Sequence, residues 1–137
     1  MIRFLPPRSQ RRRGLAIVEI ALALLLLILI LLGVLEYGWL FVRFQQVRNA
    51  ARAGARVGVT MDATPGQVTT AISTLMTDAK MPTYTTSFAD PGLVVAGTAY
   101  PVTVTVVTAN VDLTNFSLFP KPANLAATVT MRKEGVP

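Results

Sequence analysis

Residues 11–35 read RRRGLAIVEIALALLLLILILLGVL, and this stretch decides how the rest of the chain is organised. From Leu15 to Leu35 the only charged side chain is Glu19. About 20 apolar residues are enough for an α-helix to cross a bilayer core, because each residue adds ~1.5 Å of length. The stretch therefore predicts a transmembrane helix over residues 15–35.

Basic residues are concentrated ahead of this helix. Residues 1–14 hold five arginines and no acid, whereas residues 15–137 hold eight basic and seven acidic residues. The cluster Arg11, Arg12 and Arg13 should stay cytoplasmic under the positive-inside rule, which places the C-terminal part of the chain outside the cytoplasm. The net charge of +6 thus belongs to the first residues and gives no reason to expect a nucleic-acid partner.

Composition excludes several classes of protein. The chain has no cysteine and no histidine, which removes disulfides, thiol nucleophiles, imidazole bases and the usual zinc and haem ligands. The acidic residues of the C-terminal half fall in separate predicted loops or helix ends, with no close pair and no phosphate-cradling glycine loop. The sequence predicts that the protein is not an enzyme and holds no metal or cofactor.

The helical pattern continues beyond the apolar run. Apolar residues recur at steps of three and four as far as Ala55, which predicts one helix from about residue 14 to about residue 59. Its first half (15–35) would lie in lipid and its second half (36–59) would be amphipathic. Glu36 and Tyr37 come where the helix is expected to leave the lipid, and Glu36 either lies at that interface or contacts a partner subunit.

Two stripes run along the second half of this helix. The arginine stripe is read most simply as a solvated face, with two of its members, Arg52 and Arg56, as candidate partner contacts. The small-residue stripe either lets another subunit's helix approach closely or packs beneath this protein's own sheet. The arginine stripe consists of Arg48, Arg52 and Arg56, and the small-residue stripe of Ala50, Gly54 and Gly58.

Residues 60–137 are predicted to form an extracytoplasmic α+β domain. Thr64 as N-cap, proline at the first helical position and Gln67 three residues after the cap predict a helix from Pro65 to about Ala79. After Pro82 the apolar period becomes two, which is typical of strands. The alternation predicts a three- or four-stranded antiparallel sheet with one face covered by helices. The expected strands lie around residues 84–88, 102–106 and 125–131, with a further edge strand at 93–95.

Two features of this domain leave choices open. From Val107 to Val111 the apolar phase reverses, which predicts a bulge or bend in that strand. Phe116, Leu118 and Phe119, in a proline-flanked loop, either close the edge of the core or form a docking patch for a neighbouring subunit.

Three segments of the chain resemble the TadE-like pseudopilins, or minor pilins, of the tight-adherence (Tad) type IV pilus. Gly14 followed by LAIVE (15–19) and a long apolar helix looks like a prepilin cleavage site. The segments VEIALALLLLILILLGVLEYGWLF (18–41), NAARAGARVG (49–58) and LAATVTMRKE (125–134) are similar to that family. The resemblance implies a pilin-like fold.

The resemblance also implies processing. A prepilin peptidase would cut after Gly14, discard residues 1–14 as a basic leader and leave Leu15 as the new N-terminus. Its α-amino group would be a cation at neutral pH, placed to meet Glu19 of the same or a neighbouring subunit. A carboxylate at the bilayer centre costs about 2.5–3.5 kcal/mol, which such pairing would offset. The alternative is that Glu19 reaches the cytoplasmic interface.

By the same resemblance the chain is a structural or assembly subunit of a pilus used in adhesion. The implied partners are a prepilin peptidase, the inner-membrane pilus platform, other minor pilins and the major pilin. It would cross the inner membrane once, with a cytoplasmic N-terminus and an extracytoplasmic C-terminal domain, and could pass into an extracellular filament. The alternative is an uncleaved single-pass inner-membrane protein whose outer domain binds a ligand or senses the envelope.

Overall fold

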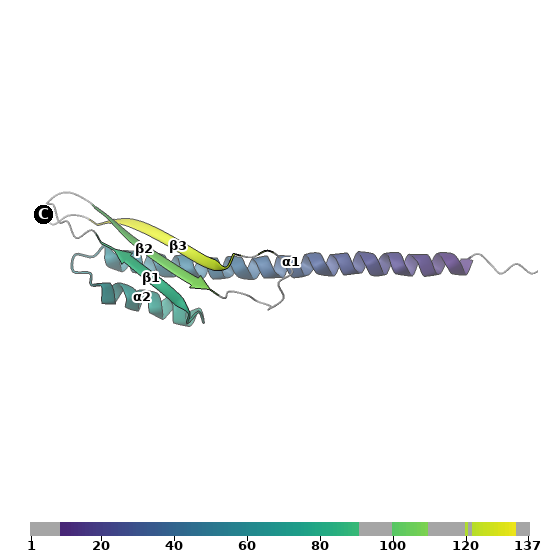
Figure 1. Ribbon diagram of the computed structural model, residues 1–137, viewed down its shortest axis with the longest axis horizontal. Helices are drawn as coiled ribbons and strands as arrows, with labels where there is room; N and C mark the ends of the chain where they lie inside the picture. The colour runs from purple at the N-terminus through teal and green to yellow at the C-terminus, as the bar shows by residue number, and fades with distance from the viewer. Residues whose placement is uncertain (1–8, 91–99, 110–119, 121, 134–137) are drawn as a thin grey trace, which may run out of the picture. The chain divides into compact units, whose positions relative to one another are not determined.

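The computed structural model describes residues 9–90, 100–109, 120 and 122–133. The elements follow in the order α1 (Ser9–Gly58), α2 (Pro65–Asp78), β1 (Tyr84–Ala89), β2 (Tyr100–Ala109) and β3 (Asn124–Lys133) (Figure 1). The chain divides into two compact units, Met1–Tyr37 and Gly38–Pro137. The expected strand at 93–95 and the loop with Phe116 to Phe119 lie outside the described residues.

Helix α1 begins earlier than the sequence pattern predicted. It starts at Ser9 rather than near Gly14 and ends at Gly58, one residue before the expected end. The arginines after Ser9 are good helix formers, so the helix extends through the basic cluster into the apolar run. At its C-terminal end, the Val59 amide donates to the Ala55 carbonyl and the Thr60 amide to that of Val57, both at 3.1 Å.

The first half of α1 is apolar on every side. Its leucines and isoleucines from Leu15 to Leu32 are exposed, including Leu15 at 72% and Leu27 at 64%. A helix that is apolar all round is suited to the core of a large protein or to a bilayer, not to water. Among the described residues, one helix is long and apolar enough to cross a membrane, which suggests a single span.

The capping signals predicted for α2 are confirmed. The Gln67 amide donates to Thr64 Oγ1 at 3.4 Å and the Thr64 amide donates to Gln67 Oε1 at 3.0 Å, which completes a capping box. At the other end, the Met81 amide donates to the Met76 carbonyl at 2.9 Å. Lys80 turns the chain there with a left-handed φ of 54°, the conformation that commonly ends a helix.

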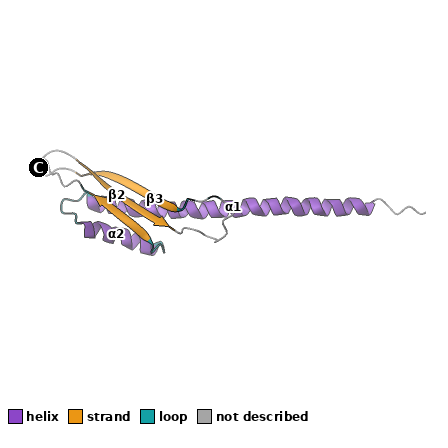
Figure 2. Cartoon of the chain, viewed as in Figure 1, coloured by secondary structure: helices purple, strands orange, loops and turns teal. Residues whose placement is uncertain are grey.

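The sheet is antiparallel throughout, with strand order β1-β2-β3 (Figure 2). Phe88 pairs with Val104, and Val104 pairs with Val129. Alternate residues of β2 therefore point to the same side, and Val102, Val104 and Val106 are fully buried. The α+β, pilin-like prediction is confirmed, with three strands among the described residues.

The predicted bulge near Val107 is wrong as far as Ala109, where the described part of β2 ends. Its register with β3 is unbroken from Tyr100 to Ala109. Thr108, and not Val107, occupies the next buried position, with 2% exposure. Its hydroxyl donates to the Thr83 carbonyl at 2.8 Å, and a satisfied hydroxyl can take a core position at little cost. The phase reversal was therefore apparent only.

The opposite side of the sheet is polar. The Thr103 and Thr130 hydroxyls lie 3.0 Å apart, and so do those of Thr105 and Thr128. Each pair joins residues that face one another across β2 and β3, and such cross-strand hydroxyl contacts stabilise a sheet modestly. One face of the sheet thus meets water while the other is covered.

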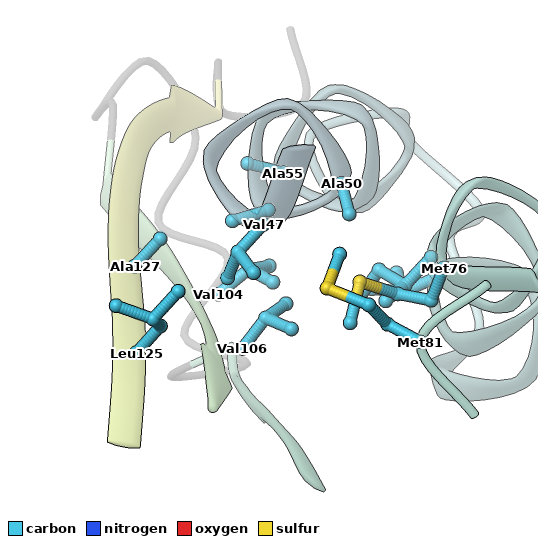
Figure 3. Packing of buried hydrophobic residues seen from close by; sticks show 12 residues of the cluster. Val47, Ala50, Ala55, Met76, Met81, Val104, Val106, Leu125 and Ala127 are labelled. Atoms are coloured by element: carbon cyan, nitrogen blue, oxygen red, sulfur yellow. The ribbon is translucent and has the colours of Figure 1, made fainter. Parts of the chain in front are cut away.

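The hydrophobic core joins the second half of α1 to α2 and the sheet (Figure 3). Val47, Ala50 and Ala55 from α1 point toward Val104 and Val106 from β2, and Met76 and Met81 complete the cluster from the α2 side. The amphipathic half of α1 is consequently part of the folded domain and supplies one wall of its core.

The small-residue stripe lies inside this core. A Cβ placed on Gly54 would come within 2.7 Å of Ile72 Cδ1, and one on Gly58 within 2.8 Å of Phe88 Cε2. Ala50 is fully buried. Of the two alternatives for this stripe, the contacts favour packing within the chain's own domain, where small residues let α2 and the sheet approach the α1 backbone.

We expect Gly54→Val to destabilise the domain by about 1–3 kcal/mol, because the added side chain overpacks a filled core. Gly38→Val is the matched control, since a Cβ on Gly38 meets nothing within 4 Å in the same helix. Urea unfolding of the detergent-solubilised chain, followed by circular dichroism, measures both. Equal midpoints for the two variants would contradict the packing described here.

Candidate assembly site

Gly14 occupies a helical position where nothing in the fold requires a glycine. A Cβ built on it meets no atom within 4 Å, and it lies inside α1. Glycine in a helix interior is less favourable than alanine by about 1 kcal/mol. The residue therefore costs helix stability without any packing benefit among the described residues, which points to a requirement outside the fold.

Glu19 lies one helical turn further on, within the apolar surface. Its side chain is exposed, as are those of the neighbouring Leu15, Ile20 and Leu22. If this part of α1 is in lipid, the carboxylate faces a medium in which an unpaired charge is unfavourable. A partner for it must come from outside the described part of this subunit or from a charge created by processing.

Glu36 and Tyr37 differ in their surroundings. Glu36 is only 8% exposed, whereas Tyr37 is 47% exposed. Of this candidate pair, Tyr37 is therefore the one whose surface is available to another subunit. The burial of Glu36 favours a structural role inside the subunit.

Arg43 is an important residue that the sequence reasoning missed. Its guanidinium lies over the Trp39 ring, 4.3 Å from the centroid, and donates to Gln46 Oε1 at 3.2 Å and to the Ala79 carbonyl. A cation is favourable at the C-terminal end of a helix, and Ala79 is the C-cap of α2. The four-residue step from Trp39 to Arg43 could have predicted the contact between these two side chains. Nothing in the sequence pattern could have predicted the hydrogen bond to Ala79.

The arginine stripe lies on the uncovered side of α1. Arg48, Arg52 and Arg56 are all exposed, whereas the small-residue stripe of the same helix is buried. The structure thus separates the two stripes that the sequence predicted: one belongs to the core and the other to the surface.

The acidic side chains of the described residues form no metal site. Among the residues described, no group of three carboxylates is close enough to hold a metal ion. Asp90 forms an ion pair with Lys133, whose Nζ lies 3.3 Å from Asp90 Oδ2, and the two side chains are 18% and 8% exposed. This pair joins the chain after β1 to the end of β3 and is best read as structural.

The exposed apolar helix, with Gly14 and Glu19 in it, lies within the segment that the family comparison matches. Residues 14–56 fit the model of the family described as TadE-like protein. Over this helix the chain is TadE-like. The TadE-like segment begins at Gly14 and ends within the last turn of α1, so it contains the candidate processing residues and the arginine stripe.

The TadE-like family is a pilin-like structural family, and the match gives no indication of an enzymatic activity. The match is consistent with a pilin-like protein associated with the Tad pilus. No curated protein and no solved structure matches the chain.

We expect Arg43→Ala to destabilise the folded domain by about 1–3 kcal/mol, because it removes the charged hydrogen bond to α2 and the contact with Trp39. Arg48→Ala is the matched control: it removes the same charge from an exposed position of the same helix and should change stability by less than about 0.5 kcal/mol. Urea unfolding of the full chain in detergent measures both. If Arg43→Ala lowers the free energy of unfolding no more than Arg48→Ala does, Arg43 does not stabilise the contact between α1 and the end of α2.

Proposed function

We propose that the chain is a minor pilin or pseudopilin of a Tad-type pilus, held in the inner membrane and processed after Gly14 before it joins or primes the filament. The observation that carries the proposal is the position of the TadE-like match. It covers one helix whose first half is apolar and uncovered and whose second half forms a wall of a folded domain. Such a subunit can move from a bilayer into a helical bundle without refolding.

Processing accounts for three features that the fold leaves unexplained. Gly14 is where a peptidase would require a small residue, although the helix itself would be more stable with alanine. The arginines before it would orient the chain and then be removed with residues 1–14. Cleavage would also create a cationic amine at Leu15, about 6 Å along the helix from Glu19.

The amine and Glu19 would then form an ion pair in an apolar bundle. Each charge alone is costly in a medium of low dielectric constant, and pairing offsets that cost only when the two groups meet in one geometry. The pair would therefore fix the axial register of a subunit entering the filament. Pairing within one subunit would also satisfy both charges, but only pairing between neighbours would set the register.

The partners follow from this role. A prepilin peptidase must act on the cytoplasmic side, the inner-membrane platform must extract the subunit, and other minor pilins and the major pilin must pack against α1. The domain formed after α1 would lie outside the cytoplasm, where it contributes to adhesion.

The second candidate is an uncleaved single-pass anchor with a sensing or ligand-binding outer domain. One observation favours it: α1 runs without a break from Ser9 through Gly14, so the bond to be cut lies within a helix. The N-terminal mass of the membrane-extracted protein distinguishes the two functions, because Leu15 as first residue supports the pilin and an intact leader supports the anchor.

We predict that Gly14→Leu blocks maturation, so that the extracted protein keeps the mass of residues 1–14, because the peptidase must accommodate the side chain before the cut bond. Gly38→Leu is the matched control, since neither position has an atom within 4 Å of an added Cβ. It should be processed normally. Leader loss from Gly14→Leu at the rate of the native chain would exclude cleavage that depends on this glycine.

We predict that Glu19→Leu inserts normally but loses crosslinking to partner pilins by about tenfold, the change that corresponds to ~1.4 kcal/mol. The apolar side chain helps insertion but leaves the new amine without a carboxylate. Glu19→Asp keeps the charge and should lose less. Unchanged crosslinking in Glu19→Leu, measured with the insertion level as reference, would rule out the ion pair as an assembly determinant.

A further inference from the structure

The exposed side of α1 within the folded domain carries charge of one sign. The segment 38–58 contains four arginines and no acidic residue. Arg43 is used inside the domain, whereas the three residues of the arginine stripe are exposed. Solvated helix faces commonly mix both signs of charge. A face with positive charges alone therefore suggests a role beyond contact with water.

No described residue compensates the arginine stripe. None of its three guanidinium groups makes an ion pair or hydrogen bond within residues 9–90, 100–109, 120 and 122–133. Like charges four residues apart on a helix repel one another, and both steps of the stripe are of this kind. The isolated subunit therefore retains a repulsion that a row of carboxylates would relieve.

The spacing of the arginine stripe determines the spacing of the carboxylates that can pair with it. Residues four apart on a helix are separated by ~6 Å along the axis, so the stripe extends for ~12 Å. A second helix with acidic residues at the same four-residue step presents carboxylates at the same spacing. The basic residues are all arginine, whose planar fork binds a carboxylate through two parallel hydrogen bonds.

A second copy of α1 cannot supply this row. Its two acidic residues are Glu19 and Glu36, seventeen positions apart, and hence ~26 Å apart along the helix. Glu36 is also buried. Helix α2 holds a single acidic residue, Asp78, so neither helix of a second copy supplies the row, and the complementary helix comes from a different kind of subunit.

A membrane surface is a poorer fit. Phe41 is exposed at 62%, and exposed aromatic side chains favour the boundary between lipid and water. Arg52 and Arg56 lie eleven and fifteen residues further on, ~16 and ~22 Å along the helix. Attraction to charged head groups is screened over ~8 Å at physiological ionic strength.

We propose that the arginine stripe is the docking surface for an acidic helix of a different pilin-type subunit, one that carries carboxylates at four-residue steps. The partner identity rests on the proposed pilin function. The charge match makes the contact selective, because a neutral or basic helix at the same place would leave the arginines unpaired.

The first test uses the full chain in nanodiscs of zwitterionic phosphatidylcholine. The probe is a helical peptide with glutamates at four-residue steps, compared with a peptide of the same composition whose glutamates are placed irregularly. We expect the regular peptide to bind at least about tenfold more tightly. Arg52→Glu should weaken it by about tenfold, whereas Arg132→Glu, an exposed arginine on β3 with the same change of charge, should not.

The outcomes of this test are distinct. Equal binding of the two peptides would show a general attraction to polyanions and overturn the proposal. Equal effects of Arg52→Glu and Arg132→Glu on peptide binding would also overturn it. So would a larger effect of Arg52→Glu on the recruitment of phosphatidylglycerol vesicles than on peptide binding. The assay requires neither cleavage nor a filament, so its failure is separate from a failure of processing at Gly14.

The second test addresses the partner in cells. Because the chain has no cysteine, Asn49→Cys gives a single exposed thiol beside the stripe. We expect it to crosslink to a pilin-type subunit with an acidic helix, identified by mass spectrometry, and to lose most of that product when Arg52→Glu is added. A crosslink unaffected by Arg52→Glu but reduced by Arg132→Glu would overturn the proposal.

Discussion

Backbone hydrogen bonding in an apolar environment is the constraint on which the structure depends. In lipid, N–H and C=O groups have no water to bind, so a single span must satisfy them within a helix. The chain meets this requirement with α1 and does not end that helix at the close of the apolar run; α1 continues to Gly58. The domain that follows is built on the second half of the same helix, whose apolar first half suggests a membrane span.

The second half of α1 changes from an all-apolar surface to one with two different sides. Its small residues lie against Ile72 and Phe88, so backbone rather than bulky side chains forms this wall of the core. Its arginines lie on the uncovered side. One helix thus supplies both the packing surface for its own domain and a free surface of distinct charge, and neither use interferes with the other.

Much of the fold could be predicted from local patterns, because the forces involved are local. Thr64 and Gln67 define the start of α2 by hydrogen bonds three residues apart, and the alternation of Val102, Val104 and Val106 defines a buried strand face. The candidate processing site was proposed from a local pattern of the same kind, since Gly14 and Glu19 are separated by little more than one helical turn, and it stays a prediction. The arginine stripe was visible from its four-residue step.

The failures arose where a residue's partner is distant in sequence. Thr108 was read as a change of phase because its acceptor, the Thr83 carbonyl, lies on another segment. Arg43 was overlooked because it binds the end of α2, thirty-six residues away. The start of α1 at Ser9 was missed for another reason. Gly14 was taken as the start of the helix, but the residues before it are also helical.

The shared core has a consequence for how the protein can be divided. Val47, Ala50 and Ala51 are fully buried and belong to the same cluster as the sheet, yet they precede residue 60, where sequence composition places the start of the outer domain. A fragment beginning at 60 would leave the valines of β2 without their cover, whereas one beginning near Gly38 would retain it. The folded domain can therefore be moved to another anchor only together with the second half of α1, because that part of the helix supplies both a wall of the core and the attachment.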